Sequence, residues 1–154
     1  MYTDQDYQAN RLQLKKRLCA VGVPALFMLA AVVWSFFVRI KLLTIVLTIV
    51  LGSGLIFCYG LLLYPVIAYG RHIGSVLYGR THVTQGVFKR MEDTPVLREG
   101  VSFYPLLISV GDPADDKDDR LFYYDANLPR PDWHAGDKLT LTAHDKQVGA
   151  WEAA

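Results

Sequence analysis

Residues 42–69 read LLTIVLTIVLGSGLIFCYGLLLYPVIAY and residues 18–38 read LCAVGVPALFMLAAVVWSFFV, and neither stretch contains Asp, Glu, Lys or Arg. A helix of about 20 apolar residues matches the ~30 Å hydrocarbon core of a bilayer. The second stretch exceeds one straight crossing, so we expect it to tilt or to end near Pro65. The rest of a 154-residue chain is too short to wrap two such runs. The sequence therefore predicts two transmembrane helices, at 18–38 and 42–69.

Only Arg39-Ile40-Lys41 separates the two stretches, and so short a link forces an antiparallel hairpin. Four Lys or Arg residues precede the first stretch, two lie in the link, and four follow the second stretch up to residue 90. The positive-inside rule then places both termini in the cytoplasm of a multi-pass cell-membrane protein. The cations expected to lie at the headgroups are Arg11, Lys15, Lys16, Arg17, Arg39, Lys41 and Arg71.

The remaining segments follow from these two spans. Residues 1–17 form an N-terminal cytoplasmic or interfacial segment, either a helix or a polar tail. Residues 70–79 are predicted to be a juxtamembrane linker helix or a bent continuation of the second span, and residues 80–154 a small β domain. A cleaved signal peptide is not expected, because the first apolar stretch exceeds the usual 7–15 residue core and lacks a small-residue cleavage pattern.

Five short segments after residue 80 are rich in β-branched and aromatic residues, as strands are: 81–90, 101–110, 120–126, 138–144 and 147–151. Leu139, Leu141 and Ala143 predict one inward-facing stripe, and Tyr104, Leu106, Ile108 and Val110 a second. Asp145-Lys146 is expected to form a two-residue hairpin turn. The predicted fold class is an α+β membrane protein, a two-helix transmembrane hairpin followed by a small five-stranded antiparallel β-barrel-like domain. The expected barrel is of the oligonucleotide-binding or SH3-like type.

Three motifs occur in order in this region: Thr84-Gln85-Gly86-Val87, Phe103-Tyr104-Pro105, and the run GDKLTL at 136–141. They resemble the G-x-V, Y-Y-P-x-V and V-G-D-x-V-x-V pattern of a family of bacterial membrane-anchored β modules of unknown function. The resemblance covers residues 80–151 and implies a small β module beside transmembrane helices, without implying an activity. The chain departs from the family where residues 144–147 replace a D-P-x-N-P-like ending, and in a longer insert between the second and third strands.

The strongest candidate for a metal site is the loop Asp112–Asp119, because five carboxylates there can supply the oxygens that calcium takes. The loop lacks the Gly and the later Glu of the calcium-binding pattern, so we interpret it as a solvated loop and leave cation binding open. The histidines, at positions 72, 82, 134 and 144, have no metal-ligand spacing and are predicted to be surface or turn residues.

No other pattern indicates chemistry. Cys19 and Cys58 lie in the apolar stretches, where we expect them to be small buried residues, and two cysteines form no disulfide framework. The chain has no nucleophile elbow and no phosphate-binding glycine loop. The sequence thus predicts no catalytic, cofactor-binding or metal-binding residue, and no cofactor.

These features favour a non-enzymatic interaction or adaptor module that tethers a β domain at the cytoplasmic face, where confinement raises its effective concentration. The expected partners are the bilayer and a protein or a second copy held through the transmembrane helices. Nucleic acid is not expected, because residues after position 69 carry 10 basic and 13 acidic side chains.

Two alternatives remain open. The first is a barrel that binds an oligosaccharide, a nucleic acid or a lipid headgroup through stacked rings. It requires three or more candidate rings on one exposed, positively charged surface, and the candidates are Phe88, Tyr104, Phe122, Tyr123, Tyr124 and Trp133. Trp133 itself is expected to close one end of the barrel. The second alternative, a membrane-bound hydrolase, has no supporting motif.

Overall fold

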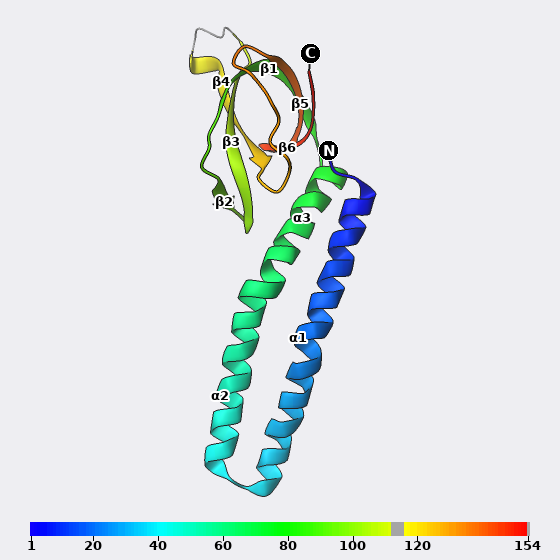
Figure 1. Ribbon diagram of the computed structural model, residues 1–154, viewed down its shortest axis with the longest axis vertical. Coiled ribbons are helices and arrows are strands. Elements are labelled where there is room, and N and C mark those ends of the chain that lie inside the picture. The colour runs from blue at the N-terminus through cyan, green and yellow to red at the C-terminus, as the bar shows by residue number, and fades with distance from the viewer. Residues whose placement is uncertain (112–115, 154) are drawn as a thin grey trace. The chain divides into compact units, whose positions relative to one another are not determined.

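A computed structural model describes residues 1–111 and 116–153 (Figure 1). The chain divides into two compact units, which are described separately. The helical unit comprises residues 8–67, and the β unit combines residues 1–7 with the chain from residue 68 onward. The segments on both sides of the helical unit in the sequence therefore belong to the same β unit.

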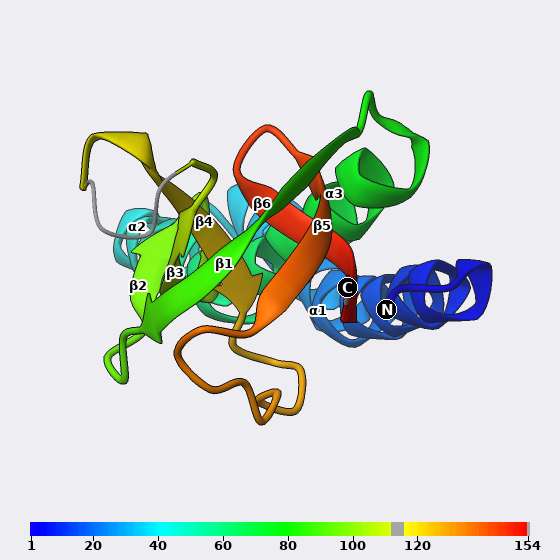
Figure 2. The same ribbon diagram turned by 90° about the horizontal axis from the view of Figure 1, so that it is seen from above.

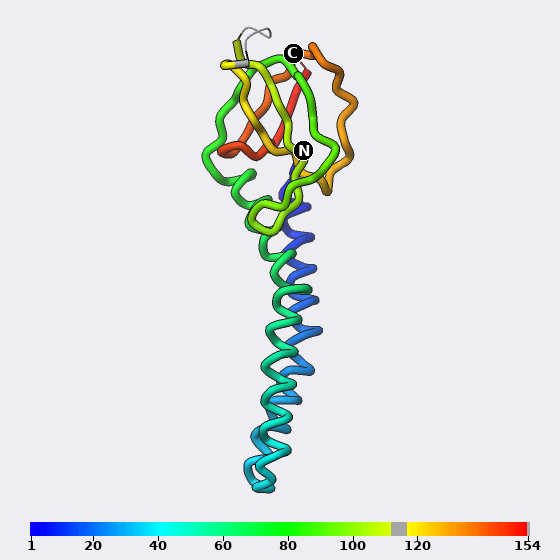
Figure 3. The backbone as a smooth tube through the Cα atoms, turned by 90° about the vertical axis from the view of Figure 1, so that its left-hand side faces the viewer, coloured from blue at the N-terminus to red at the C-terminus, as the bar shows by residue number. Residues whose placement is uncertain are grey.

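The helical unit has two arms joined by a tight turn (Figure 3). The first arm is α1 (Asp4–Val38), and the second continues through α2 (Lys41–Cys58), the π-helix η1 (Tyr59–Leu63) and α3 (Tyr64–Tyr78). The first turn of α1, up to residue 7, and α3 from residue 68 onward belong to the β unit. Both arms are long and apolar enough to cross a membrane, and none of the most apolar window of the second arm is buried. Large exposed side chains on the arms include Leu26, Phe27, Leu42, Ile56 and Phe57.

The two arms run antiparallel, as the short link predicts. Near one end of the hairpin, Nδ2 of Asn10 donates a 3.2 Å hydrogen bond to the carbonyl of Val66. Near the other end, the hydroxyl groups of Ser35 and Thr44 lie 2.9 Å apart, and Ser35 is fully buried. The two contacts fix the register of the arms at both ends of the hairpin, and the second lies beside the turn at residues 39–40.

Pro65 does not end the second arm, because the chain remains helical to Tyr78. A proline inside a helix removes one backbone hydrogen bond and crowds the preceding turn. The wider π turn of η1 ends two residues before Pro65, so it lies in the preceding turn that the proline ring crowds. The helix therefore does not end at Pro65, and residues 70–78 continue it, which fits the expected continuation of the second span; where the membrane crossing ends stays a prediction. At the N-terminus α1 begins at Asp4, so most of the segment before residue 18 is helical.

The β unit contains β1 (His82–Met91), β2 (Val96–Arg98), β3 (Val101–Ser109), β4 (Asp119–Asp125), β5 (Lys138–His144) and β6 (Gln147–Ala153). A short 3-10 turn, η2 (Asp116–Asp118), precedes β4. The strand order is β1-β5-β6-β4-β3-β2, and β1 also pairs with β3. Figure 2 shows β1 lying between β3 and β5.

The sheet corrects the predicted five-stranded antiparallel arrangement, because it has six strands and is mixed. All five expected strands form, but the three-residue β2 was missed, since so short a segment shows no alternating pattern. The parallel pair is β4 with β6, whose partners are Tyr123 and Gln147. Direction of pairing between strands distant in sequence depends on chain topology, which alternation within one strand does not encode.

The core of the sheet confirms the inward stripe of β5 and the hairpin after it. Leu139, Leu141 and Ala143 are buried, and His144 pairs with Gln147 across the Asp145-Lys146 turn. On β3 the predicted stripe holds only at its centre, where Leu106 and Ile108 are fully buried. Tyr104 is half-buried, and Val110 lies beyond the strand and is exposed.

The other face of β3 is also covered. Val101 and Phe103 pack against Ala68 of α3, and both are at most 4% exposed. A second cluster joins Tyr2 to Ile73 and Val76 of α3. Residues 1–7 and 68–78 therefore bury apolar area within the β unit, and they bring polar groups with them into the same region.

Candidate functional site

A buried polar network lies where the N-terminal segment, α3 and the end of β4 meet. Its members are Tyr2, His72, Asp125 and Gln147, and Tyr2, His72 and Asp125 are 9%, 5% and 0% exposed. Charged and polar groups at such depth are stable only when they are hydrogen-bonded. The hydrogen bonds of this network therefore hold the N-terminal segment, α3 and the end of β4 in one arrangement within the β unit.

Asp125 is held by the turn that follows β4. Its Oδ1 accepts hydrogen bonds from the backbone N–H of Asn127 at 2.8 Å and from Nδ2 of the same residue at 2.9 Å. An Asp side chain that bonds the backbone two residues later is a common turn-forming arrangement. Its second oxygen, Oδ2, accepts a 2.6 Å bond from the hydroxyl of Tyr2.

The proton of the Tyr2 hydroxyl is fixed by this contact. Burial raises the pKa of the Tyr2 phenol far above its ordinary value, and the hydrogen bond to Asp125 raises it further. Tyr2 therefore stays protonated and donates to Asp125, which leaves its oxygen lone pairs as acceptors. Nε2 of His72 lies 3.0 Å from that oxygen, so Nε2 carries a proton and donates to Tyr2.

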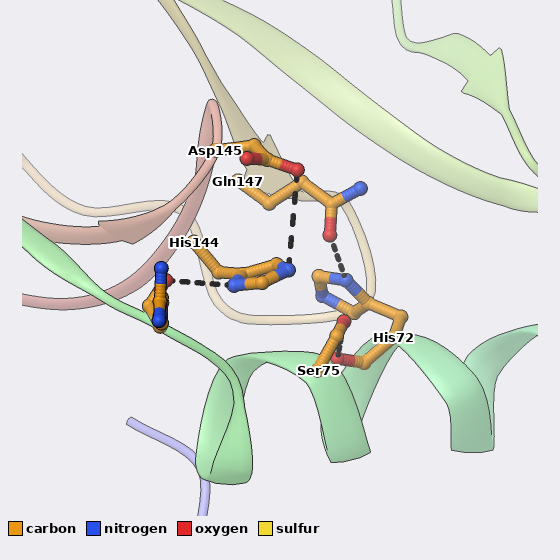
Figure 4. Close-up of polar contacts among 6 residues, drawn as sticks. His72, Ser75, His144, Asp145 and Gln147 are labelled. Atoms are coloured by element: carbon orange, nitrogen blue, oxygen red, sulfur yellow. Dashed lines mark hydrogen bonds and ion pairs between the residues drawn. The ribbon is translucent and has the colours of Figure 1, made fainter.

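The other ring nitrogen of His72, Nδ1, lies 2.7 Å from Oε1 of Gln147, as Figure 4 shows. Burial lowers the pKa of the imidazole, and the contacts with Gln147 and Asp125 oppose that effect. A neutral ring with its proton on Nε2 needs a donor at Nδ1, which the Gln147 amide offers after a half-turn of its side chain. An imidazolium would donate to Oε1 as it stands. The two protonation states of His72 thus match two orientations of Gln147.

His144 belongs to a neighbouring set of contacts in the same region (Figure 4). Its Nδ1 lies 2.8 Å from the carbonyl of Arg80, and since a carbonyl only accepts, Nδ1 carries the proton. Its Nε2 lies 3.9 Å from Oδ2 of Asp145. These contacts hold the start of β1 beside the β5–β6 turn.

A small pocket of about 30 Å³ adjoins His72. Its lining includes Arg71, Ser75, Arg98, Glu99 and Gln147. A volume of this size accommodates about one water molecule, and its polar lining offers that water hydrogen-bond partners. The pocket is therefore suited to a bridging water and is too small for an organic ligand.

The six aromatic residues considered for a stacking surface do not gather on one exposed face. Phe88, Phe122 and Tyr124 are at most 7% exposed and belong to the core cluster. Trp133 packs against that cluster, with its ring 5.6 Å from Phe88 and 5.7 Å from Tyr124. Trp133 therefore packs on the core of the sheet, and its closing one end of a barrel stays a prediction. Tyr104 contacts the same cluster, and Tyr123 lies 4.2 Å beneath the guanidinium of Arg98.

Of the acidic loop Asp112–Asp119, residues 112–115 lie outside the described residues. Lys89 bonds the carboxylate of Asp119 at 2.9 Å. Within residues 1–111 and 116–153, no three His, Cys, Asp or Glu side chains lie close enough together to hold a metal ion. Cys19 and Cys58 are free, and Cys19 is exposed on its helix rather than buried as expected.

Sequence reasoning missed His72, because it treated all four histidines alike. His82 and His134 are exposed, as expected, whereas His72 is buried. One signal was available: His72 precedes Ile73, Val76 and Leu77 on a helical pattern and follows Ala68 by one turn. Comparisons of the chain with protein-family models, with curated proteins and with solved structures found no match.

Proposed function

We propose that this chain is a membrane-anchored, non-enzymatic interaction module. Its helical hairpin crosses the bilayer, and its β unit meets a protein partner at the membrane surface. The observation that carries the proposal is the exposed apolar surface of both arms, since none of the most apolar window of the second arm is buried. Such a surface is unstable in water and is matched by lipid. Tethering the β unit there raises its effective concentration for a partner in the same membrane.

A same-side placement of both ends of the hairpin is part of this proposal. Tyr2 precedes the helical unit and Asp125 follows it, yet their side chains are hydrogen-bonded within one β unit. This contact supports a hairpin with both termini on the same face of the bilayer. The Lys and Arg residues before the first span and after the second favour the cytoplasmic face.

The form of the β unit is also proposed to be a small closed barrel of the oligonucleotide-binding type. The pairings β1–β5, β5–β6, β6–β4, β4–β3 and β3–β1 return to their starting strand, which supports closure. Closure removes sheet edges from these five strands and leaves β2 as an added strand on β3. The resemblance to bacterial membrane-anchored β modules is consistent with this form.

The surface proposed to meet the partner is the strand β2. It pairs with β3 on one side and ends the strand order, and Leu97 at its centre is 73% exposed. A strand edge with an exposed apolar side chain is a common template for an added peptide strand. An extended segment of another protein is therefore the expected ligand.

Two measurements test the proposal in order. First, alkaline carbonate extraction of cell membranes should leave the chain in the membrane pellet, and release into the supernatant would contradict the membrane location. Second, a photo-crosslinking residue at Leu97 should capture a defined protein in intact membranes. The matched control carries the crosslinker at Lys146, which is exposed in the β5–β6 turn. Equal capture from both positions, or none from Leu97, would contradict β2 as the interaction surface.

A further inference from the structure

The two arms of the helical unit leave an open apolar crevice between them, with a volume of about 340 Å³. Its lining includes Ala20, Ala25 and Met28 of the first arm and Leu51, Gly54 and Leu62 of the second. Apart from its chain neighbours and the backbone of its own helix, no atom lies within 4 Å of the position that a Cβ would take at Gly54. Small side chains on the facing surfaces therefore leave room that neither arm fills.

The crevice has the size and character of a hydrocarbon site. An apolar cavity of about 150 Å³ holds one benzene ring, so the crevice offers room for a chain of about a dozen carbons. At ~1.5 Å per helical residue, the lining from Ala20 to Met28 extends over about 12 Å along the first arm. In the hydrocarbon core of a bilayer, lipid acyl chains and not water molecules surround such an opening.

One end of the crevice carries a cation. Nη1 of Arg17 donates a 2.9 Å hydrogen bond to the carbonyl of Leu62, which lines the crevice. Arg17 lies one helical turn before Ala20, and Leu62 belongs to the π-helix Tyr59–Leu63. Arg17 as a whole is half-buried, and the planar array of N–H donors on its guanidinium suits a phosphate group. π-helical turns occur frequently at functional sites.

We propose that the crevice binds one anionic glycerophospholipid, with an acyl chain between the arms and its phosphate on Arg17. This inference rests on the membrane location proposed above. Basic pockets between transmembrane helices at the cytoplasmic side bind anionic headgroups, and here the cation and the apolar crevice adjoin. A second copy of the chain complements the site less well. Residues 7–91 contain no Asp or Glu, so the apolar spans of a second copy would bring no acidic side chain to Arg17.

Native mass spectrometry tests the proposal on the full chain. The protein is reconstituted in bilayers that mix phosphatidylcholine and phosphatidylglycerol of identical acyl chains, and is then released into mild detergent. The wild type should retain one phosphatidylglycerol per chain in preference to phosphatidylcholine. Gly54→Leu fills the crevice, and Arg17→Gln removes the cation. Each should lower retention of phosphatidylglycerol by about tenfold or more, the size expected for a lost charged hydrogen bond or a blocked site.

Matched controls separate the site from general effects on the helices. Gly52→Leu places the same side chain in open space on the same helix but outside the crevice lining, and Lys16→Gln removes a neighbouring charge. Both should retain phosphatidylglycerol within about twofold of the wild type. Equal loss in Gly52→Leu and Gly54→Leu, or equal retention of the two phospholipids, would overturn the proposal. The proposal would also be overturned if the chain formed a dimer that Gly54→Leu dissociates and that phosphatidylglycerol leaves intact.

A second readout uses the unmodified chain. Cys58 lines the crevice and Cys19 does not, and both thiols are free. Phosphatidylglycerol added to the detergent-solubilised protein should slow the reaction of Cys58 with N-ethylmaleimide and leave Cys19 unchanged. Unchanged labelling of Cys58 would contradict the lipid site and leave the proposed membrane location standing. A chain that carbonate releases from membranes would instead contradict the membrane location and the lipid site together.

Discussion

The hydroxyl of Tyr2 donates a 2.6 Å hydrogen bond to Oδ2 of Asp125, a residue 123 positions later in the chain. Asp125 is fully buried, and its other oxygen is occupied by Asn127. The residues before the helical hairpin thus contribute a donor to a carboxylate in the β unit. Because a buried carboxylate that loses a donor is costly, this contact links the N-terminal segment to the stability of the β unit.

Tyr2→Phe is expected to destabilise the β unit by about 1–3 kcal/mol, because it removes the donor that Tyr2 supplies to the buried carboxylate of Asp125. Thermal unfolding of the full chain in detergent, followed by near-ultraviolet circular dichroism, measures the change. The matched control is Tyr78→Phe, since Tyr78 is 66% exposed and its hydroxyl donates to Asp4 at 2.6 Å. The control should change stability by less than about 0.5 kcal/mol. Equal effects of the two substitutions would contradict a structural role for the Tyr2 bond.

The stability of the β unit is expected to fall as the pH drops below about 6.5, the ordinary pKa of histidine. Burial lowers the pKa of His72 in the folded chain, so in this range the unfolded chain binds a proton that the folded chain does not. The contribution is fully present above about 6.5, declines as the pH falls, and levels off below the folded pKa. Charged groups that bear on His72 are Asp125, Glu99 and His144.

The measurement is the unfolding midpoint of the wild type and of His72→Gln between pH 7.5 and pH 5, values chosen to bracket the pKa of histidine. His72→Gln should flatten the slope, because glutamine keeps hydrogen-bonding groups and does not titrate. His134→Gln serves as the control, since His134 is exposed. A slope that His72→Gln leaves unchanged would assign the pH dependence to other groups.

Short-range patterns account for the parts of the fold that the sequence predicted. The alternation at 139–143 determines which side of β5 faces the core, and the three-residue link at 39–41 determines the antiparallel hairpin. The polar network was not predictable in the same way. Tyr2, His72 and Asp125 come together only through contacts between distant segments, and no local spacing relates them. The parallel pairing of β4 with β6 has the same origin.

Close packing of β6 on α3 depends on the absence of a side chain at Gly149. A Cβ at this position would collide with Cγ1 of Val76. Valine is stiff at χ1 in a helix, so it cannot turn away without cost. Gly149→Ala should therefore destabilise the β unit by about 1–3 kcal/mol. The double variant Gly149→Ala with Val76→Ala should recover about 1 kcal/mol relative to the sum of the single changes. If the losses in free energy of unfolding simply add in the double variant, the side chains at the two positions do not clash.

Trp133 supports the core through its ring and not through its indole N–H. The ring lies 5.1 Å from that of Trp151, and Nε1 is buried without a hydrogen-bond acceptor among the described residues. Trp133→Phe removes that N–H and keeps an aromatic ring. The loss of buried apolar area destabilises the fold, and the removal of a buried N–H without an acceptor stabilises it by a similar amount. We expect Trp133→Phe to change the free energy of unfolding by less than about 1 kcal/mol, and Trp133→Ala to cost about 3 kcal/mol. Thermal unfolding of both variants in detergent measures these two changes in stability. If phenylalanine costs as much as alanine, the indole N–H has a partner that stabilises the fold.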